Sequence, residues 1–192
     1  MSADNLKDFI FLLSKQIFPE TITITNIKIS FLCNKKAEIN NDVCISYYKC
    51  YNLIVKYDNY TYTFLGKNKS HLNITGINSI LDVETAITGL TRFSNLQLSN
   101  FKNFNVDNIS STFKTHPGLK EILLNINQVD FRIFKPCCFC GIIIKYKNCS
   151  LIYFNSGSVI LVGLKNVHEL NLYVKKYKTF FDHCKIFEKN VL

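Results

Sequence analysis

The stretch from Ile142 to Lys165 limits the possible folds of this chain more than any other part of it. It contains three short runs of β-branched and apolar residues, separated by residues that are typical of turns. The runs are 141–146, 150–154 and 158–162. Asn155-Ser156-Gly157 indicates a hairpin between the last two runs. From Asn166 the apolar period changes from two to about 3.6, which predicts a helix over 166–185.

A helix layer covers only one face of such a sheet, yet both faces are apolar. Four apolar residues share one parity and point away from the helix-covered face: Ile152, Phe154, Ile160 and Val162. A sheet that is apolar on both faces needs a second layer or a partner against its bare side. We therefore expect this bare face to be a binding surface.

The same order of elements occurs earlier in the chain. Residues 3–17 predict an amphipathic helix, and strand patterns then follow at 21–31, 45–57, 60–65 and 72–75, with a helix at 79–93. The second half predicts a strand at 104–113 and a helix at 119–126 before the three runs. The polar segment 34–41 allows at most one weak helical turn.

Three short motifs recur in the same order in both halves. Asn-Ile recurs after 82 residues (26 to 108), Lys-Tyr after 89 residues (56 to 145), and a glycine that precedes a helix after 87 residues (76 to 163). Similar spacings in the same order predict an internal duplication. Two such halves, joined edge to edge, would form one curved antiparallel sheet with helices on its convex side, an α+β fold.

The composition favours an anionic partner. The 192 residues carry a formal net charge of +9, and 47% of them are hydrophobic, which is typical of a folded chain. The Lys- and Asn-rich composition is typical of proteins that AT-rich genomes encode. No signal peptide is recognisable, so we expect the eight cysteines to be reduced thiols inside the cell.

The motifs of catalysis and metal binding are weak in this sequence. Cys137, Cys138, Cys140 and Cys149 lack the paired knuckles of a zinc site, so we expect buried thiols, with neither zinc nor a disulfide. The four histidines lie in dissimilar contexts, and there is no phosphate-binding glycine loop. We expect a protein without enzymatic activity and without a cofactor.

Several motifs resemble the TATA-box-binding protein family. The second repeat of that family has Phe-Pro-Gly, Phe-x-Ser-Gly-Lys and Thr-Gly-Ala-Lys, and its first strands carry Gln-Asn-Ile/Met-Val. The matching segments here are Phe139-Cys140-Gly141, Phe154-Asn155-Ser156-Gly157-Ser158, Val162-Gly163-Leu164-Lys165, Thr25-Asn26-Ile27-Lys28 and Asp107-Asn108-Ile109-Ser110. The resemblance covers residues 20–189 and is clearer in the second repeat.

This resemblance implies a saddle-shaped fold that lies along the DNA minor groove and bends the duplex with pairs of Phe side chains. Carried over by position, the DNA-contacting residues are the wedges Phe139, Phe154 and Phe64, the pair Asn26 and Asn108, the floor residues Thr75, Ile152, Ile160 and Val162, and the basic residues Lys56, Lys145 and Lys165. The family also uses its last helix to meet other transcription factors, and here that helix carries Lys175, Lys176 and Lys178.

The first repeat departs from the family pattern. The position that matches Phe139 is Cys50, with Tyr51 beside it, and Lys28 replaces an apolar residue. In the second repeat the family's Thr becomes Val162, and its hairpin Lys becomes Ser158.

We therefore predict a transcription initiation factor that binds and bends AT-rich promoter DNA and meets RNA polymerase or other initiation factors. It would act without a membrane, in the nucleus or, if a large DNA virus encodes it, in a cytoplasmic viral factory. The alternative is a subunit of the same fold that binds protein partners and no longer binds DNA. The predicted domains are a helical extension at 1–19, repeats at 20–93 and 101–192, and a connector at 94–100.

Overall fold

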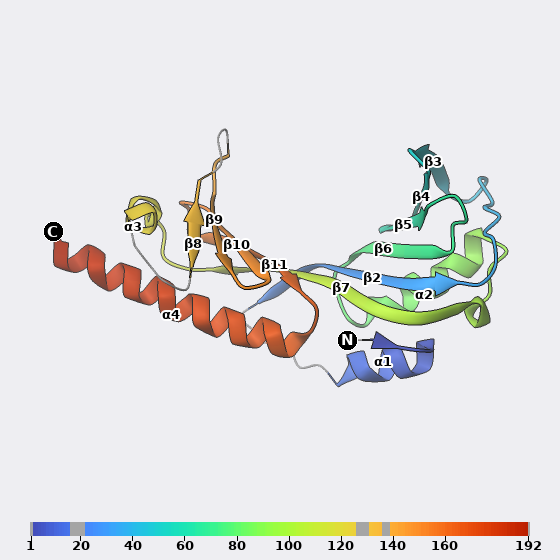
Figure 1. Cartoon of the computed structure of the whole chain (residues 1–192), viewed down its shortest axis with the longest axis horizontal. Helices are drawn as coiled ribbons and strands as arrows, with labels where there is room; N and C mark the ends of the chain where they lie inside the picture. Colours follow the sequence, from blue (N-terminus) through green and yellow to red (C-terminus); the bar gives the residue numbers. More distant parts are fainter. Residues whose placement is uncertain (1, 16–21, 126–130, 136–138, 192) are drawn as a thin grey trace. The chain divides into compact units, whose positions relative to one another are not determined.

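The computed structural model describes residues 2–15, 22–125, 131–135 and 139–191. Figure 1 shows its elements. The helices are α1 (Leu6–Ser14), α2 (Asp82–Phe93), α3 (Lys120–Asn125), α4 (Val167–Val191) and the 3-10 turn η1 (Leu98–Asn100). The strands are β1 (Ser2–Ala3), β2 (Thr23–Cys33), β3 (Ile45–Lys49), β4 (Asn52–Tyr57), β5 (Tyr60–Leu65), β6 (His71–Ile77), β7 (Phe101–Lys114), β8 (Arg132–Phe134), β9 (Ile142–Tyr146), β10 (Cys149–Tyr153) and β11 (Ser158–Leu164).

The chain forms two compact units. The first contains residues up to 16 together with 24–109, and the second contains 17–23 together with 110–192. The long strand β7 belongs to both, because the division falls after Ile109. Within the first unit the strand order is β3-β4-β5-β6-β2-β7, with β1 beside β7. Within the second unit the order is β7-β11-β10-β9-β8.

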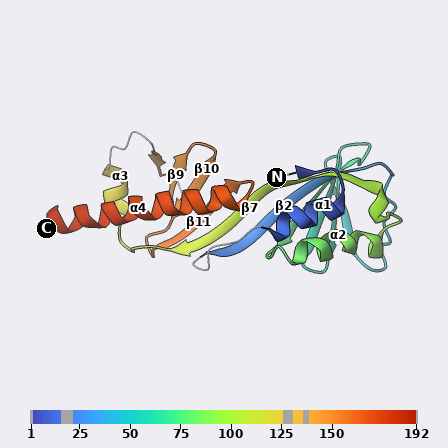
Figure 2. The same ribbon diagram turned by 90° about the horizontal axis from the view of Figure 1, so that it is seen from below.

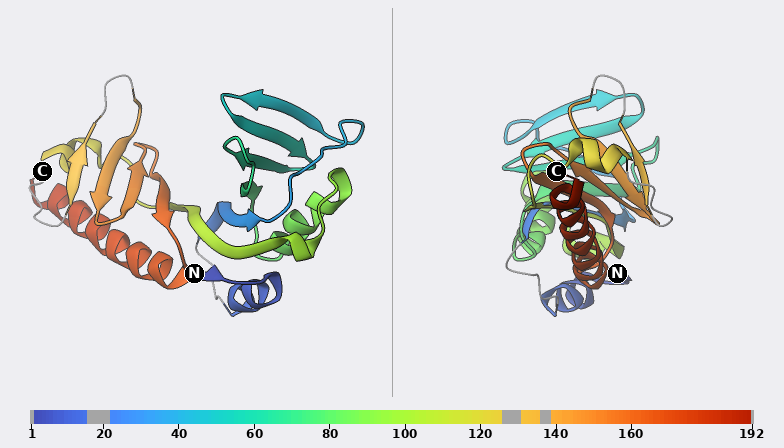
Figure 3. Two further views of the ribbon diagram at one scale, coloured as in Figure 1. Left: turned by 45° about the vertical axis from the view of Figure 1, so that its right-hand side comes forward. Right: turned by 90° about the vertical axis from the view of Figure 1, so that its left-hand side faces the viewer.

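Eight pairs of strands are antiparallel: β1–β7, β2–β6, β3–β4, β4–β5, β5–β6, β8–β9, β9–β10 and β10–β11. This pairing confirms the predicted α+β fold built on an antiparallel sheet. In the first unit, α1 and α2 lie on the same side of the strands (Figure 2). In the second unit, α4 runs along one face of β8–β11 (Figure 3). In each unit the helices therefore cover one face of the sheet.

An aromatic side chain anchors the helix to the sheet in each unit. In the first unit, the Tyr62 hydroxyl donates to the Ala86 carbonyl (2.8 Å), and its ring contacts Phe93 at a centroid distance of 4.9 Å. Gly89 makes room for Tyr62, because an added Cβ would lie 2.7 Å from its hydroxyl oxygen. In the second unit, Tyr153 packs against Phe181 at a centroid distance of 5.4 Å. These contacts build the two cores on the helix-covered face.

The backbone confirms the internal duplication at two pairs of matching positions. Asp58 and Lys147, in the turns that follow the repeated Lys-Tyr motif, both have φ = +50°. Gly76 and Gly163 have φ of +91° and +95°, and a Cβ added to either would lie 2.5 or 2.6 Å from the carbonyl oxygen of Asn59 or Asn148. The two halves therefore need glycine at the same place for the same steric reason.

Several predicted boundaries differ from the structure. The predicted strand 45–57 is two strands, because Cys50 adopts a left-handed conformation (φ = +57°) and reverses the chain. The polar segment 34–41 contains no helical turn but an isolated bridge between Ile39 and Ser94. The strands β1 and β8 lack a sequence signal, since they contain only two and three residues. The predicted ends at 16–17, 21 and 126, together with Cys137 and Cys138, lie outside the described residues.

Replacing Gly76 or Gly163 by Ala should destabilise the protein strongly and to a similar extent. Each substitution adds a clash with a backbone carbonyl to the cost of about 1–2 kcal/mol for a left-handed alanine. Gly66→Ala is a matched control, because Gly66 also has positive φ (+71°) but no atom within 4 Å of an added Cβ. Urea unfolding measures the three losses, and a Gly76→Ala or Gly163→Ala loss no larger than that of Gly66→Ala would contradict the duplication.

Candidate nucleic-acid interface

Among the residues that the structure describes, no helix lies on one of the two faces of the strands in each unit, and we call this face the open face. Along β2 and β11, buried residues alternate with half-buried ones, and the half-buried side chains lie on the open face. Residues directly opposite each other in neighbouring strands share a face, so the strand register assigns the rest. The open face comprises Lys28, Ser30, Leu32, Ile54, Lys56, Thr61, Thr63, Leu65, His71, Asn73 and Thr75 in the first unit, and Ile143, Lys145, Ser150, Ile152, Ile160 and Val162 in the second.

The open face of the second unit has an apolar floor. Ile143, Ile152 and Ile160 lie opposite one another across three strands, and Val162 lies next to them opposite Ser150. All four are half-buried although no helix covers them. The sequence prediction that Ile152, Ile160 and Val162 share a face away from the helix therefore agrees with the strand register.

Two phenylalanines lie together beside this floor. The rings of Phe139 and Phe154 have a centroid distance of 6.2 Å and an interplanar angle of 57°, and both side chains are half-buried. Gly141 allows this arrangement, because an added Cβ would lie 2.8 Å from Cε1 of Phe139 and 3.0 Å from Cγ2 of Ile152. The glycine of the Phe139-Cys140-Gly141 motif thus leaves space for the Phe139 ring.

The predicted hairpin holds Phe154 in place. The Phe154 N–H donates to the Ser158 carbonyl (2.9 Å), and the Gly157 N–H donates back to the Phe154 carbonyl (2.8 Å). The segment before α3 braces this turn, since the Thr115 N–H donates to the Gly157 carbonyl (2.8 Å). Phe154 also lines a groove of about 750 Å³ that contains Lys114 and Lys178.

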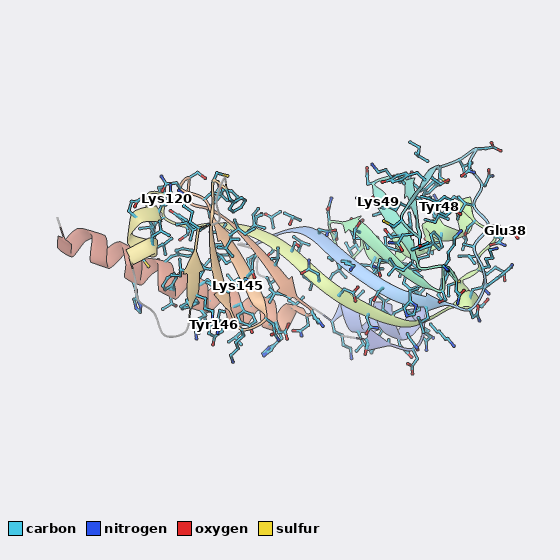
Figure 4. All side chains as sticks on the ribbon, turned by 45° about the horizontal axis from the view of Figure 1, so that its top comes forward. Glu38, Tyr48, Lys49, Lys120, Lys145 and Tyr146 are labelled. Atoms are coloured by element: carbon cyan, nitrogen blue, oxygen red, sulfur yellow. The ribbon has the colours of Figure 1, made fainter. Side chains whose placement is uncertain are left out.

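Basic side chains accompany the open face in both units. Arg132 and Lys145 lie directly opposite each other on β8 and β9, although two cations in this position repel each other. Figure 4 shows Lys145 next to Tyr146, whose hydroxyl accepts a hydrogen bond from Lys176 of α4 (2.7 Å). Lys56 of the first unit is exposed. Lys165 directly follows β11 and is exposed, and its backbone N–H donates to the Glu169 carboxylate (3.2 Å).

Asn26 holds a bulge in β6. Ile27 pairs with Ile77 and Ile29 with Ile74, so β6 has an extra residue at this point. The Gly76 N–H donates to Oδ1 of Asn26 (2.7 Å). Because Oδ1 must face this donor, the amide nitrogen Nδ2 points the other way with two hydrogens to donate. Asn108, the second predicted asparagine, is half-buried in β7.

The open face of the first unit is mainly polar. Ser30, Asn73 and Thr63 lie opposite one another on successive strands, and Thr75, Thr61 and Lys56 form the next row. By the spacings of the repeat, Thr63, Asn73 and Thr75 correspond to Ile152, Ile160 and Val162 of the apolar floor. The two units therefore offer different chemistry on the same scaffold.

Phe64 is not part of this surface, and its prediction as a wedge is wrong. Its side chain is 0% exposed and lies opposite Leu53 and Leu72 on the helix-covered face. The spacing of 89 residues that relates Lys56 to Lys145 relates Phe154 to Leu65, which lies on the open face opposite His71. Since strand residues alternate between faces, a register error of one residue exchanges core for surface.

A cluster of aromatic and basic side chains that the sequence did not predict lies around the turn between β3 and β4. Tyr48 and Tyr51 are 65% and 69% exposed. Lys69 donates to the Tyr48 hydroxyl (2.7 Å), and Lys67 lies 5.6 Å from the centroid of the Tyr51 ring. Figure 4 shows Tyr48 with Lys49 in this unit. The cluster is visible in the sequence as Tyr47-Tyr48-Lys49 followed by Tyr51, but the predicted continuous strand over 45–57 hides the turn that brings these residues together.

Cys149 and Cys184 are buried and belong to the cores, whereas Cys140 is exposed, so its prediction as a buried thiol is wrong. Burial raises the pKa of Cys149 to about 12 and that of Cys184 to about 11, so both thiols are neutral near pH 7. Within the ranges that the structure describes, no three His, Cys, Asp or Glu residues gather in a way that could hold a metal ion. None of the described helices is both long and apolar enough to span a membrane.

Comparison with known proteins identifies the fold class and one solved structure that is similar to this chain. No protein-family model matches the chain, and no curated protein matches it. Among solved structures, the TBP of Methanococcus jannaschii is similar, with a TM-score of 0.65 and 20% sequence identity over 87% of this chain and 99% of that one. The chain therefore has a TBP-like fold.

Phe64→Ala should lower the free energy of unfolding by about 3–5 kcal/mol, as expected for a buried phenylalanine. Leu65→Ala should cost well under half of this, because Leu65 is half-buried on the open face. Chemical denaturation of both variants measures the difference. Equal losses, or a larger loss for Leu65→Ala, would contradict the assigned faces.

Proposed function

We propose that this protein is a TBP-like transcription initiation factor that binds double-stranded DNA through its open face and bends it from the minor groove. The observation that carries the proposal is the pair Phe139 and Phe154, two half-buried rings in contact beside an apolar floor. Apolar wedges of this kind kink DNA when they enter between base pairs.

The energetics fit a bending mechanism. Unstacking a base step costs a few kcal/mol, and the bend must gain contacts to offset this cost. The floor of Ile143, Ile152, Ile160 and Val162 supplies apolar area for the flattened groove next to the wedge. The hairpin bonds fix the backbone of Phe154 before DNA arrives, so this backbone need not be ordered on binding.

The charges and donors fit a nucleic acid. The net charge of +9 attracts a polyanion, and Arg132 and Lys145, opposite each other on β8 and β9, place two cations where phosphates could approach. The minor groove of A·T pairs presents only acceptors, and Nδ2 of Asn26 is a donor. These features favour AT-rich promoter DNA as the ligand.

The partners of such a factor would be RNA polymerase or other initiation factors. We place its action at promoters, in the nucleus or, if the gene is viral, in a cytoplasmic viral factory. The TBP-like fold supports the assignment of these partners. No step in this role requires a cofactor or catalysis by the chain.

One observation favours a second function. The first unit has Cys50 and Leu65 where the second has Phe139 and Phe154, and its open face is polar. A subunit that binds protein partners through this face, without DNA, would have the same arrangement. The two functions differ in whether the isolated protein bends a duplex.

Replacing both Phe139 and Phe154 by Ala should abolish most of the DNA bending and weaken binding, while the protein remains folded. Fluorescence energy transfer between dyes at the two ends of an AT-rich duplex measures the bend, and thermal melting measures the stability. Phe11→Ala is the control, because Phe11 is a solvent-accessible phenylalanine (56% exposed) that lies on α1 and not on the open face.

The control should bend DNA like the unchanged protein. A double variant that bends DNA normally but melts much earlier would assign both rings to the core and refute the wedge. If the unchanged protein neither binds nor bends any duplex, the function as a protein-binding subunit takes its place.

A further inference from the structure

The open face of the first unit carries a carboxylate. Asp107 of β7 accepts a hydrogen bond from the Ser30 hydroxyl at Oδ1 (2.8 Å), and its Oδ2 lies 3.5 Å from the Lys28 ammonium nitrogen. Ser30 and Lys28 both point to the open face from β2, so Asp107 does too. The Asp107 side chain remains 32% exposed.

An acid is an unexpected residue for a surface that meets DNA. Phosphates repel it, and the minor-groove edges of A·T pairs present only the acceptors N3 and O2. A carboxylate only accepts hydrogen bonds, so against A·T pairs Asp107 would lose its water and gain no donor from the DNA in exchange. Losing hydration without new hydrogen bonds is costly for an ionised group.

Guanine removes this conflict, because its 2-amino group is the one donor that base pairs present in the minor groove. We propose that Asp107 accepts a hydrogen bond from the 2-amino group of a guanine and so makes the first unit select a G·C pair. This inference rests on the proposed binding of DNA through the open face. It adds a specificity-determining residue to a surface that otherwise suits A·T pairs.

Lys28 and Ser30 position the carboxylate for this contact. The Ser30 hydroxyl fixes one oxygen, and Lys28 offsets the charge that would repel the phosphates. An ionised carboxyl has about four lone-pair sites, so these two partners leave acceptor capacity for an amino hydrogen. Hydrogen bonds to a charged acceptor are also stronger than neutral ones.

The nearest alternative is that Lys28 and Asp107 only neutralise each other. A self-contained ion pair would leave the face indifferent to the guanine amino group. The two cases differ in one chemical group of the DNA, so base analogues can separate them.

The experiment uses the full chain and a set of AT-rich duplexes in which a single G·C pair occupies each position of the site in turn. Each duplex has a partner with inosine in place of guanine, which lacks only the 2-amino group. At one position G·C should bind about tenfold more tightly than I·C, as expected for a hydrogen bond to a charged acceptor. Adding the amino group to an A·T pair, as 2,6-diaminopurine·T, should strengthen binding at the same position.

Asp107→Ala should remove the difference between G·C and I·C at that position. Asp107→Asn removes the charge but keeps nearly the same shape, so it should reduce the difference in affinity between G·C and I·C. This variant keeps the test valid if the alanine variant misfolds. Asp58→Asn is the control, because Asp58 is an exposed acid in the β4–β5 turn with φ = +50°, which asparagine tolerates. This control should keep the full difference.

Two results would overturn the inference while leaving DNA binding intact. In one, I·C binds as tightly as G·C, or more tightly, at every position. In the other, folded Asp107→Ala keeps the preference for G·C, which would assign it to another residue. A protein that binds none of the duplexes above the level of non-specific DNA would refute the inference and the proposed function together.

Discussion

The alternation of side chains along the strands is the constraint on which the rest of the structure depends. Each strand places neighbouring residues on opposite faces, and each unit has helices on only one of them. The buried aromatic anchors Tyr62 and Tyr153 belong to the helix-covered face. The other set of side chains is left without a layer of its own chain, and this set forms the candidate binding surface.

The two repeats share the residues that the backbone geometry requires, but they differ in the side chains on their open faces. Gly76 and Gly163 are held to the same residue by backbone geometry, because a Cβ at either position would meet a carbonyl oxygen. No such constraint acts on Thr75 and Val162, which are surface residues in the same strands. The open face of the first unit is polar and carries Asp107 beside Lys28, while that of the second unit has an apolar floor. We propose that the second unit deforms DNA and that the first reads its bases.

Much of this could be predicted from sequence, because hydrophobic period and glycine position act locally. The hairpin at Asn155-Ser156-Gly157, the apolar row and the duplication each followed from short patterns. Phe64 was misplaced because a shift of one residue in the register exchanges the two faces of a strand. The hydrogen bond from Gly76 to Asn26 and the ion pair of Asp107 with Lys28 join residues that are far apart in sequence. Local sequence patterns therefore cannot predict them.

The most direct test of the account is to observe isoleucine methyl groups by NMR while an AT-rich duplex is added. The chain supplies its own control, since isoleucines lie on both faces: Ile54, Ile143, Ile152 and Ile160 on the open face, and Ile29, Ile74 and Ile144 on the helix-covered face. We predict large shifts of the open-face methyl signals and small shifts of the others. Shifts confined to residues near the helices, with the open-face signals unchanged, would contradict the assignment of this face to DNA.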